Sequence, residues 1–354
     1  MAYNLGMNQL TLALPFALPH AALAGDLIKA LQTPALAALL SRTSSSSLHE
    51  FDGTTRLLPH EAWLAHALAL APAAGSDDAA APFAAASMRG FGLVPEPGAR
   101  YFLIHPVHIE ITRKHLAMDD MRQLQLSEAD SRTLFELVRP YFDGLGQPLY
   151  FGDAHTWFMR ADEWSDLRCA SPDAAASQNL ADWMPDGEHA RASRRLQNEV
   201  QMLWHEHPVN QAREARGLKT VNGYWLWGAA KHQLATCAHA LHVSAAPGWL
   251  SALAEPSRRD ADPAAIIAGQ ADALVVHAGL LESAMAQDWG NWLAQMQALE
   301  QHWFAPLLSA LKDGRLDRLR LVLSHRDGWL DCSTSRNAQR KFWRAHTLNT
   351  LSSS

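Results

Sequence analysis

The stretch that most limits the fold of this chain runs from Asn198 to Gly228 and joins two kinds of secondary structure. Up to His205, apolar residues recur at helical spacing. Pro208 then predicts the end of that helix, because a proline disfavours the helical conformation of the residue before it. A strand is predicted from Gly223 onward, where two tryptophans stand two residues apart before a glycine turn. The segment therefore indicates a domain that mixes helices and strands.

The connection between this helix and this strand is rich in side chains that bind anions. Arginine pairs with carboxylates and phosphates in bidentate geometry, and histidine and asparagine supply further hydrogen bonds. We therefore predict an anion-binding pocket that contains His207, Asn210, Arg213, Arg216 and Asn222. The alternative is a structural segment, in which the tryptophans pack in a core and the arginines are solvated.

The pattern HPVNxxR, followed by G and then by VNxxWLWG, resembles the signature of archaeal-type cofactor-independent phosphoglycerate mutases, members of the alkaline phosphatase superfamily. The segment RRLQNEVQMLWHEHPVN, with the MPDG turn before it, is similar to the bacterial RpfE-type regulatory proteins. The resemblance implies an alkaline-phosphatase-like α/β fold, with a three-layer α/β/α core and a small inserted α+β domain. We expect the core over residues 1–97 and 172–354 and the inserted domain over residues 98–171.

The same resemblance implies a phosphoryl-transfer centre with two divalent metal ions and a Ser or Thr nucleophile. The first predicted strand, Leu10 to Leu18, contains no carboxylate, and Pro59-His60-Glu61 occupies the place of the nucleophile. The turns that bring further metal ligands in the family retain only Glu282 and His325 as candidates. Two ligands are too few for a dinuclear site. We therefore expect no catalytic residues, no bound metal and no other cofactor.

These losses predict a catalytically degenerate phosphoglycerate-mutase-like protein with a regulatory role, or with a binding role for a small phosphorylated or carboxylated metabolite. An active enzyme, either a divergent mutase or a single-metal phosphatase that uses Mn or Mg, is the alternative. It rests on His325, Asp327 and Asp331, which follow one predicted strand. A second predicted strand is followed by His277 and Glu282, and strand ends of open α/β sheets face a common crevice.

A third hypothesis is a structural module that binds a protein partner. Arg336, Arg340 and Arg344 fall four residues apart near the carboxyl end, which is typical of an exposed helix face and would suit an acidic partner. The long helix predicted at Ala284–Lys312 carries a wide apolar face that suits either a core position or a dimer contact.

The composition excludes other classes of function. The formal net charge is -6 and no basic stripe runs through the sequence, so we expect no nucleic-acid partner. No apolar run is long enough to cross a bilayer, so we expect no membrane association. The three cysteines are far apart and odd in number. They indicate a reducing cytoplasm rather than a disulfide framework.

The remaining pattern predicts further elements. Ser127 is expected to cap a helix that runs through Val138, and the strand at Gly223 is expected to join the main sheet of the core. The other predicted elements are a helix near Ala24–Arg42, loops at Ser44–Ser47 and Ala71–Ala86, and helices near Pro59–Leu70 and Lys231–Leu241.

Overall fold

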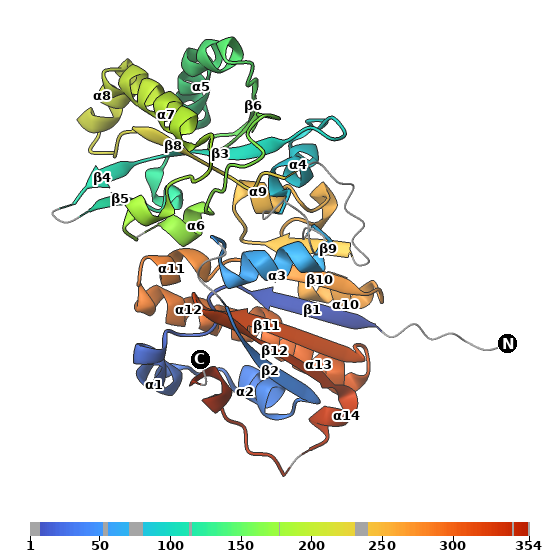
Figure 1. The fold of residues 1–354 in the computed structure, drawn as a ribbon. Coiled ribbons are helices and arrows are strands. Elements are labelled where there is room, and N and C mark those ends of the chain that lie inside the picture. The colour runs from blue at the N-terminus through green and yellow to red at the C-terminus, as the bar shows by residue number, and fades with distance from the viewer. Residues whose placement is uncertain are drawn as a thin grey trace. The chain divides into compact units, whose positions relative to one another are not determined.

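The computed structural model of the chain describes residues 8–51, 56–70, 81–112, 115–176, 178–230, 240–341 and 343–352. Within these ranges the chain forms two compact units (Figure 1). The first unit comprises Met1–Gly53, Cys237–Pro247 and Ala254–Ser354, and the second unit comprises Thr54–Thr236 and Gly248–Leu253.

The first unit is built on a six-stranded sheet of mixed direction. Its strands are β1 (Gln9–Leu14), β2 (Ser45–Glu50), β9 (Ala240–Ser244), β10 (Ala273–His277), β11 (Arg318–Ser324) and β12 (Gly328–Ser335). They lie in the order β2-β12-β11-β1-β10-β9. The last four strands in this order are parallel, whereas β12 and β2 run antiparallel to their neighbours at one edge. The central strands β1 and β10 are almost continuous buried apolar runs, which is typical of parallel strands.

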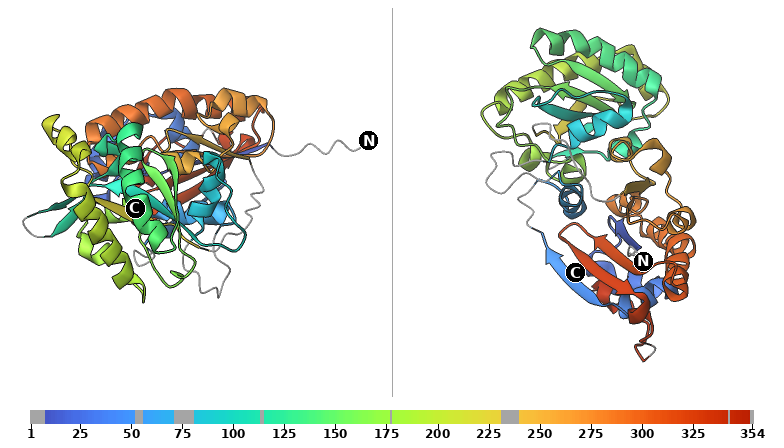
Figure 2. Two further views of the ribbon diagram at one scale, coloured as in Figure 1. Left: turned by 90° about the horizontal axis from the view of Figure 1, so that it is seen from above. Right: turned by 90° about the vertical axis from the view of Figure 1, so that its right-hand side faces the viewer.

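The first unit also contains helices, several of which contact the sheet. They are α1 (Ala21–Ala30), α2 (Pro34–Ser41), α10 (Pro263–Ala268), α11 (Leu281–Met285), α12 (Trp289–Leu299), α13 (Ala305–Asp313), α14 (Arg336–Gln339), the π-helix η6 (Glu300–Phe304), and the 3-10 helices η5 (Pro256–Arg258) and η7 (Asn349–Ser352). α2 contacts β12, α13 contacts β11, and α2 also contacts η6 and α13, so these helices share one face of the sheet (Figure 2). The α/β class predicted from the sequence is confirmed.

The second unit contains a four-stranded antiparallel sheet and a separate two-stranded hairpin. The strands are β3 (Tyr101–Val107), β4 (Ile109–Ile111), β5 (Leu116–Met118), β6 (Leu149–Asp153), β7 (Thr156–Arg160) and β8 (Gly223–Trp227). The sheet has the order β6-β7-β3-β8, and β4 pairs with β5 in the hairpin. The helices are α3 (Pro59–Ala67), α4 (Phe83–Met88), α5 (Glu128–Gly144), α6 (Pro172–Ala175), α7 (Ala190–His205), α8 (Pro208–Ala215), α9 (Gly248–Ser251), and the 3-10 helices η2 (Arg89–Phe91), η3 (Met121–Leu124) and η4 (Leu180–Trp183).

Helices α5 and α7 lie beside each other against this sheet (Figure 1). A core of buried apolar side chains, many of them aromatic, joins the sheet and these helices. The indole of Trp157 packs edge-on against the rings of Phe135 and Trp204, with centroids 5.2 Å and 5.9 Å apart. As predicted, Ser127 caps α5, because its hydroxyl accepts a hydrogen bond of 3.1 Å from the Asp130 amide. Burial of these large rings provides much of the stability of the unit.

The strand at Gly223 lies in a different sheet from the one predicted. β8 pairs with β3 in antiparallel register, with Trp227 opposite Leu103, and is the edge strand of the four-stranded sheet. The second unit therefore extends beyond the domain expected at residues 98–171 and includes α3, α7 and α8. Local sequence patterns specify that a segment is a strand, but they do not specify which distant strand it pairs with.

Two predictions near the amino terminus differ from the structure for local reasons. The helix expected near Ala24–Arg42 is divided into α1 and α2, because Pro34 begins a new helix as its first residue. The loop expected at Ser44–Ser47 is mostly strand β2, which is polar and exposed. Its backbone pairs with β12, and this pairing stabilises a strand that its side chains alone do not favour.

The connection that precedes β8 also differs. α7 ends at His205, but Pro208 then begins α8 instead of a polar turn. Part of the loop predicted at Ala71–Ala86 is helix α4. Residues 71–80 and 231–239, which carry the rest of that loop and most of a predicted helix, lie outside the described residues.

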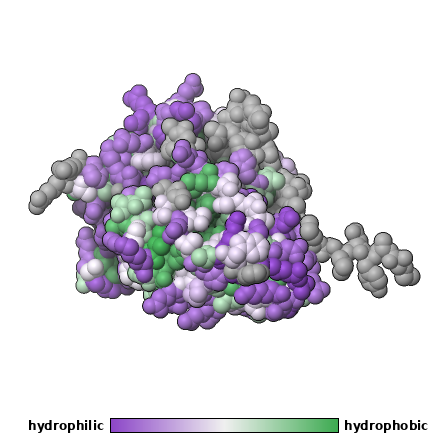
Figure 3. Space-filling view, turned by 90° about the horizontal axis from the view of Figure 1, so that it is seen from below, coloured by the Kyte–Doolittle hydropathy of each residue, from purple (hydrophilic) through white to green (hydrophobic). Residues whose placement is uncertain are grey.

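Hydrophilic side chains surround a smaller group of apolar ones on the face shown in Figure 3. Large apolar side chains exposed in the described part of the first unit include Leu48 and Trp343. No helix among the described residues has the length and apolar character needed to span a bilayer.

Candidate functional site

The carboxyl ends of the parallel strands in the first unit are where open α/β sheets usually bind ligands. β1, β10 and β11 end at Leu14, His277 and Ser324, and β9 ends at Ser244. Because these strands are parallel and adjacent, their ends lie along one edge of the sheet. The polar groups at these ends are two hydroxyls and one imidazole, and the end of β1 carries no carboxylate.

The loop after β1 closes this end of the sheet with hydrogen bonds. Phe16 is buried and has a φ of 58°, which is uncommon for a residue other than glycine. Its amide donates to the Ser324 hydroxyl at 3.3 Å, and the Leu18 amide donates to the Ser324 carbonyl at 3.0 Å. The indole N–H of Trp292 donates to the Phe16 carbonyl at 2.9 Å. Ser324 stands where the family resemblance implies a carboxylate ligand, and it holds the β1 loop instead.

The two residual metal-ligand candidates, Glu282 and His325, are not joined by further ligands. Glu282 is exposed in the first turn of α11. The Nδ1 of His325 accepts a hydrogen bond of 3.2 Å from the Asp327 amide, and burial lowers the pKa of this imidazole. Asp331 pairs with Arg320 at 3.0 Å. No three His, Cys, Asp or Glu side chains converge as metal ligands in the described part of the chain. The residues present therefore do not fit the two-metal centre that the resemblance implies.

The five residues of the predicted anion pocket lie in the second unit around α8, and most of them bind backbone groups. His207 is the N-cap of α8, and its Nδ1 accepts from the Val209 amide at 3.2 Å. Asn210 is buried and donates to the carbonyls of Trp204 and Val221 at 2.7 Å and 2.9 Å. Its side-chain oxygen Oδ1 accepts a hydrogen bond from the Val221 amide at 2.8 Å. Asn210 thereby ties the end of α7 to the segment that enters β8.

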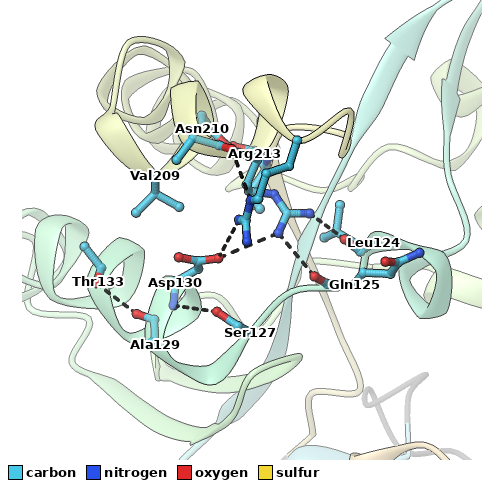
Figure 4. Close-up of polar contacts among 12 residues, drawn as sticks. Leu124, Gln125, Ser127, Ala129, Asp130, Thr133, Val209, Asn210 and Arg213 are labelled. Carbon is cyan, nitrogen blue, oxygen red and sulfur yellow. Dashed lines mark hydrogen bonds and ion pairs between the residues drawn. The ribbon is translucent and has the colours of Figure 1, made fainter.

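Arg213 is fully buried, and its guanidinium is surrounded by backbone carbonyls (Figure 4). Its Nε donates to the Lys219 carbonyl at 2.9 Å. One terminal nitrogen donates to the Gln125 carbonyl at 3.3 Å, and the other donates to the Leu124 carbonyl. The Asp130 carboxylate lies 4.0 Å away. Every nitrogen of the guanidinium therefore binds the protein itself, and Arg213 joins α8 to the connection between η3 and α5.

Asn222 and Arg216 have partners of their own. The Asn222 side chain donates to the Ile109 carbonyl and accepts from the Ile109 amide, both at 2.7 Å, which anchors the start of β4. The side chain of Arg216 is 56% exposed and lies 3.5 Å from the Asp130 carboxylate. Arg216 is thus accessible to solvent, whereas Arg213 is not. Ligand binding by these five residues stays a prediction, and the contacts seen are those of a structural framework.

A groove of about 830 Å³ lies between α7 and the β4-β5 hairpin. Its lining includes Asn210 and Asn222, and the apolar side chain of Met202. It also includes Glu206 and Glu214 but no lysine or arginine. This charge distribution does not favour an anionic ligand in the groove.

The second unit contains a buried ionic cluster that the sequence did not predict. Arg122 donates two hydrogen bonds to Asp173, at 2.8 Å and 3.1 Å, and pairs with Asp120 at 2.9 Å. Burial and the neighbouring Asp173 raise the pKa of Glu61 to about 8, and burial lowers the pKa of His60 to about 4. The place of Glu61 in the first turn of α3 is a capping signal. No local pattern indicates that it is buried beside a second carboxylate.

No family model matches the chain. A probable 2,3-bisphosphoglycerate-independent phosphoglycerate mutase of Geobacter sulfurreducens is 27% identical over 134 residues, which are 37% of this chain and 33% of that protein. The 2,3-bisphosphoglycerate-independent phosphoglycerate mutase of Methanothrix thermoacetophila is 27% identical over 111 residues, 31% of this chain and 28% of that protein. This chain is similar, at low identity, to phosphoglycerate mutases. The matched segment spans a third or less of each curated relative.

Two solved structures also resemble the chain. The cofactor-independent phosphoglycerate mutase from Thermoplasma acidophilum has a TM-score of 0.44 and 13% identity, with 98% of this chain and 94% of that chain covered. The PH0037 protein from Pyrococcus horikoshii has a TM-score of 0.48 and 12% identity, with 92% and 87% covered. The similarity to RpfE-type regulatory proteins stays a prediction.

Proposed function

We propose that this chain is a catalytically degenerate relative of the phosphoglycerate mutases that has a binding and regulatory role instead of a phosphoryl-transfer activity. The observation that carries this proposal is the end of β1, where the Phe16 amide is bonded to the Ser324 hydroxyl and no carboxylate is present. Phosphoryl transfer between two metal ions requires several carboxylate and imidazole ligands and a hydroxyl nucleophile. The strand ends hold two hydroxyls and one imidazole but no carboxylate, so they do not supply the ligand set that two metal ions require.

The similarity to phosphoglycerate mutases supports the ancestry but not the activity. The segments matched in the curated relatives cover a third of their length or less, so their activity is not transferred to this chain. The contacts of Arg213 also argue against its role as an anion ligand, because all its nitrogens bind backbone carbonyls. An anion role for the predicted pocket would rest on the exposed Arg216.

Elemental analysis and activity assays on the purified full chain test the proposal. We expect manganese, magnesium and zinc at far less than one atom per chain. With added Mn²⁺ or Mg²⁺, we expect no mutase turnover of 3-phosphoglycerate and no phosphatase turnover of p-nitrophenyl phosphate above that of a His325→Ala variant. A phosphoglycerate mutase assayed in parallel shows that the conditions support catalysis.

Metal bound near one atom per chain, together with metal-dependent turnover that disappears in His325→Ala, would establish the enzyme and overturn the proposal. His325 suits this variant because it follows β11 and the polar contacts described for its imidazole are local, a hydrogen bond from the Asp327 amide and a distance of 3.8 Å to the exposed Asp327 carboxylate. The substitution is therefore expected to leave the fold intact.

A further inference from the structure

A pocket of about 430 Å³ lies at the carboxyl ends of β9 and β10 in the first unit. Strands, α12 and η6 all contribute to it, and its lining includes His277, Leu280, Gln295, Leu299, His302 and Trp303. This volume falls within the range of small-molecule sites. Its position at the ends of adjacent parallel strands is also the usual one for ligand sites in open α/β sheets.

The wall of the pocket that η6 forms has an uncommon backbone. π-Helices are rare, and single turns of this kind occur often at functional sites. Glu300 begins η6 and is buried, and its carboxylate accepts hydrogen bonds from the amides of Ala35 and Leu36 at 2.6 Å and 3.1 Å. These two amides belong to the first turn of α2, where a negative charge is favourable. The anchor fixes η6 and thereby holds His302 and Trp303 on the pocket wall.

The lining supplies hydrogen-bond donors but no carboxylate, ammonium or guanidinium group. The Nδ1 of His277 accepts from the Gly279 amide at 3.3 Å, which assigns the proton of the neutral ring to Nε2. Burial lowers the pKa of His277 and so favours this neutral form. The Ser283 hydroxyl lies 2.6 Å from Oε1 of Gln295 and 3.1 Å from the Leu280 carbonyl, and we assign its single proton to the nearer acceptor, which leaves the NH₂ group of Gln295 as a donor.

We propose that this pocket binds a small, uncharged aromatic molecule that carries a hydrogen-bond acceptor such as a carbonyl oxygen. Leu280, Leu299 and Trp303 provide apolar walls, and the Trp303 ring stands edge-on to the His277 ring with centroids 5.8 Å apart. An aromatic ligand gains from contacts of this geometry. The lining offers no lysine or arginine to pair with an anion that loses its hydration there, so the pocket favours an uncharged ligand. This inference rests on the proposed binding function and deepens it by naming a ligand class.

Benzamide and benzoate are suitable probes, because they share a ring and nearly the same size but differ in charge. Binding to the full chain is measured by saturation-transfer NMR and by titration, in buffer that contains EDTA so that no metal contributes. We expect benzamide to bind. We expect benzoate to bind at least about tenfold more weakly, because its charge is desolvated without a partner.

Variants on α12 locate the bound probe. Ala298 lines the pocket and is otherwise exposed, so Ala298→Phe fills the pocket without disturbing the core. Ala294→Phe is the matched control, since Ala294 is exposed one turn earlier and does not line the pocket. We expect the first variant to abolish benzamide binding and the second to leave it unchanged. Gln295→Met keeps the length of the side chain and removes its donor, which should weaken binding about three- to tenfold, the effect of one hydrogen bond.

Three results would each overturn this inference: no benzamide binding to the native chain, binding that survives Ala298→Phe, or benzoate bound as tightly as benzamide. These results do not depend on turnover. If metal-dependent activity were found while Ala298→Phe still abolished benzamide binding, the proposed function would fail and the assignment of the pocket would stand.

Discussion

Replacing Arg213 with alanine should destabilise the second unit far more than replacing its neighbour Arg216. The Arg213 side chain supplies donors to three backbone carbonyls, those of Lys219, Gln125 and Leu124. These carbonyls belong to segments that are far apart in the sequence, and the side chain is fully buried. Truncation would leave the three acceptors without their donor and would open a cavity where the guanidinium lies.

The size of the effect follows from these contacts. Each buried polar group left without a partner costs about 1–3 kcal/mol, and neighbouring losses are not fully additive. We therefore expect Arg213→Ala to lower the free energy of unfolding by about 3–5 kcal/mol. Arg216, at the end of α8, is the matched control: Arg216→Ala removes only its solvent-exposed ion pair with Asp130 of α5. Such a pair contributes less than about 1 kcal/mol.

Urea unfolding measures the loss of stability. Hydrogen exchange of the amides in α8 and β8 is a second measurement, and it shows whether the loss occurs within the second unit. An Arg213→Lys variant separates the positive charge of Arg213 from its hydrogen bonds. Lysine keeps the positive charge but cannot direct donors to three carbonyls at once. We expect Arg213→Lys to lose most of the stability that Arg213→Ala loses.

Equal unfolding midpoints for Arg213→Ala and Arg216→Ala would refute the framework role of Arg213. A second refuting result would be an Arg213→Lys variant as stable as the native chain, together with an Arg213→Ala variant that had lost binding of an acid such as 3-phosphoglycerate. That pattern would mean that Arg213 supplies charge to a ligand and not hydrogen bonds to the framework.

Two further predictions concern the second unit. The pKa of Glu61 is about 8 in the folded chain against 4.5 for the ordinary group, so the folded state holds one more proton than the unfolded state between these values, and stability is lost as pH rises through about 8. From pH 6.5 to 8 this group alone should lower the free energy of unfolding by about 2 kcal/mol, at about 1.4 kcal/mol per pH unit. The buried histidines oppose this fall, because their pKa values are lowered in the folded chain and their unfolded forms still lose protons near pH 6.5. The comparison is therefore with Glu61→Gln, which keeps these histidines: the native chain should lose stability relative to the variant, and an unchanged difference over this range would contradict the assignment. Asn210→Ala removes three buried hydrogen bonds and should lower the free energy of unfolding in urea by about 2–3 kcal/mol. Gln211→Ala, on the exposed side of α8, should lower it by less than about 0.5 kcal/mol. Equal midpoints for these two variants would count against the framework role of Asn210.

Several elements of the fold could be predicted because their signals are local. Ser127 stands just before an amphipathic run and caps α5, and its hydroxyl reaches an amide only three residues away. The apolar runs at Gly223 and Ala273 form strands, as their composition predicts. Pro208 shows the limit of such signals, because a proline both ends one helix and suits the first position of the next, and the sequence alone does not distinguish the two.

The candidate site was less predictable, because its residues act through distant partners. Arg213 has the charge of an anion ligand, but its acceptors include the carbonyls of Leu124 and Gln125, which the chain brings to it only on folding. The pocket near His277 could not be predicted from spacing either. One of its walls is a π-helix whose first residue, Glu300, is held by the first turn of α2.

The sequence by itself determined that the runs at Gly223 and Ala273 form strands, that Ser127 caps a helix, and that the strand before Phe16 carries no carboxylate, because these properties depend on side chains within a few residues of one another. Only the tertiary structure decided that β8 pairs with β3, that Arg213 is buried among carbonyls, and that α12 and η6 form walls of a pocket without carboxylate, ammonium or guanidinium groups. The physical reason is that hydrogen-bond partners and burial are set by segments that meet only when the chain folds. A side chain that could bind a ligand therefore becomes part of the framework when backbone carbonyls of distant segments accept its hydrogen bonds.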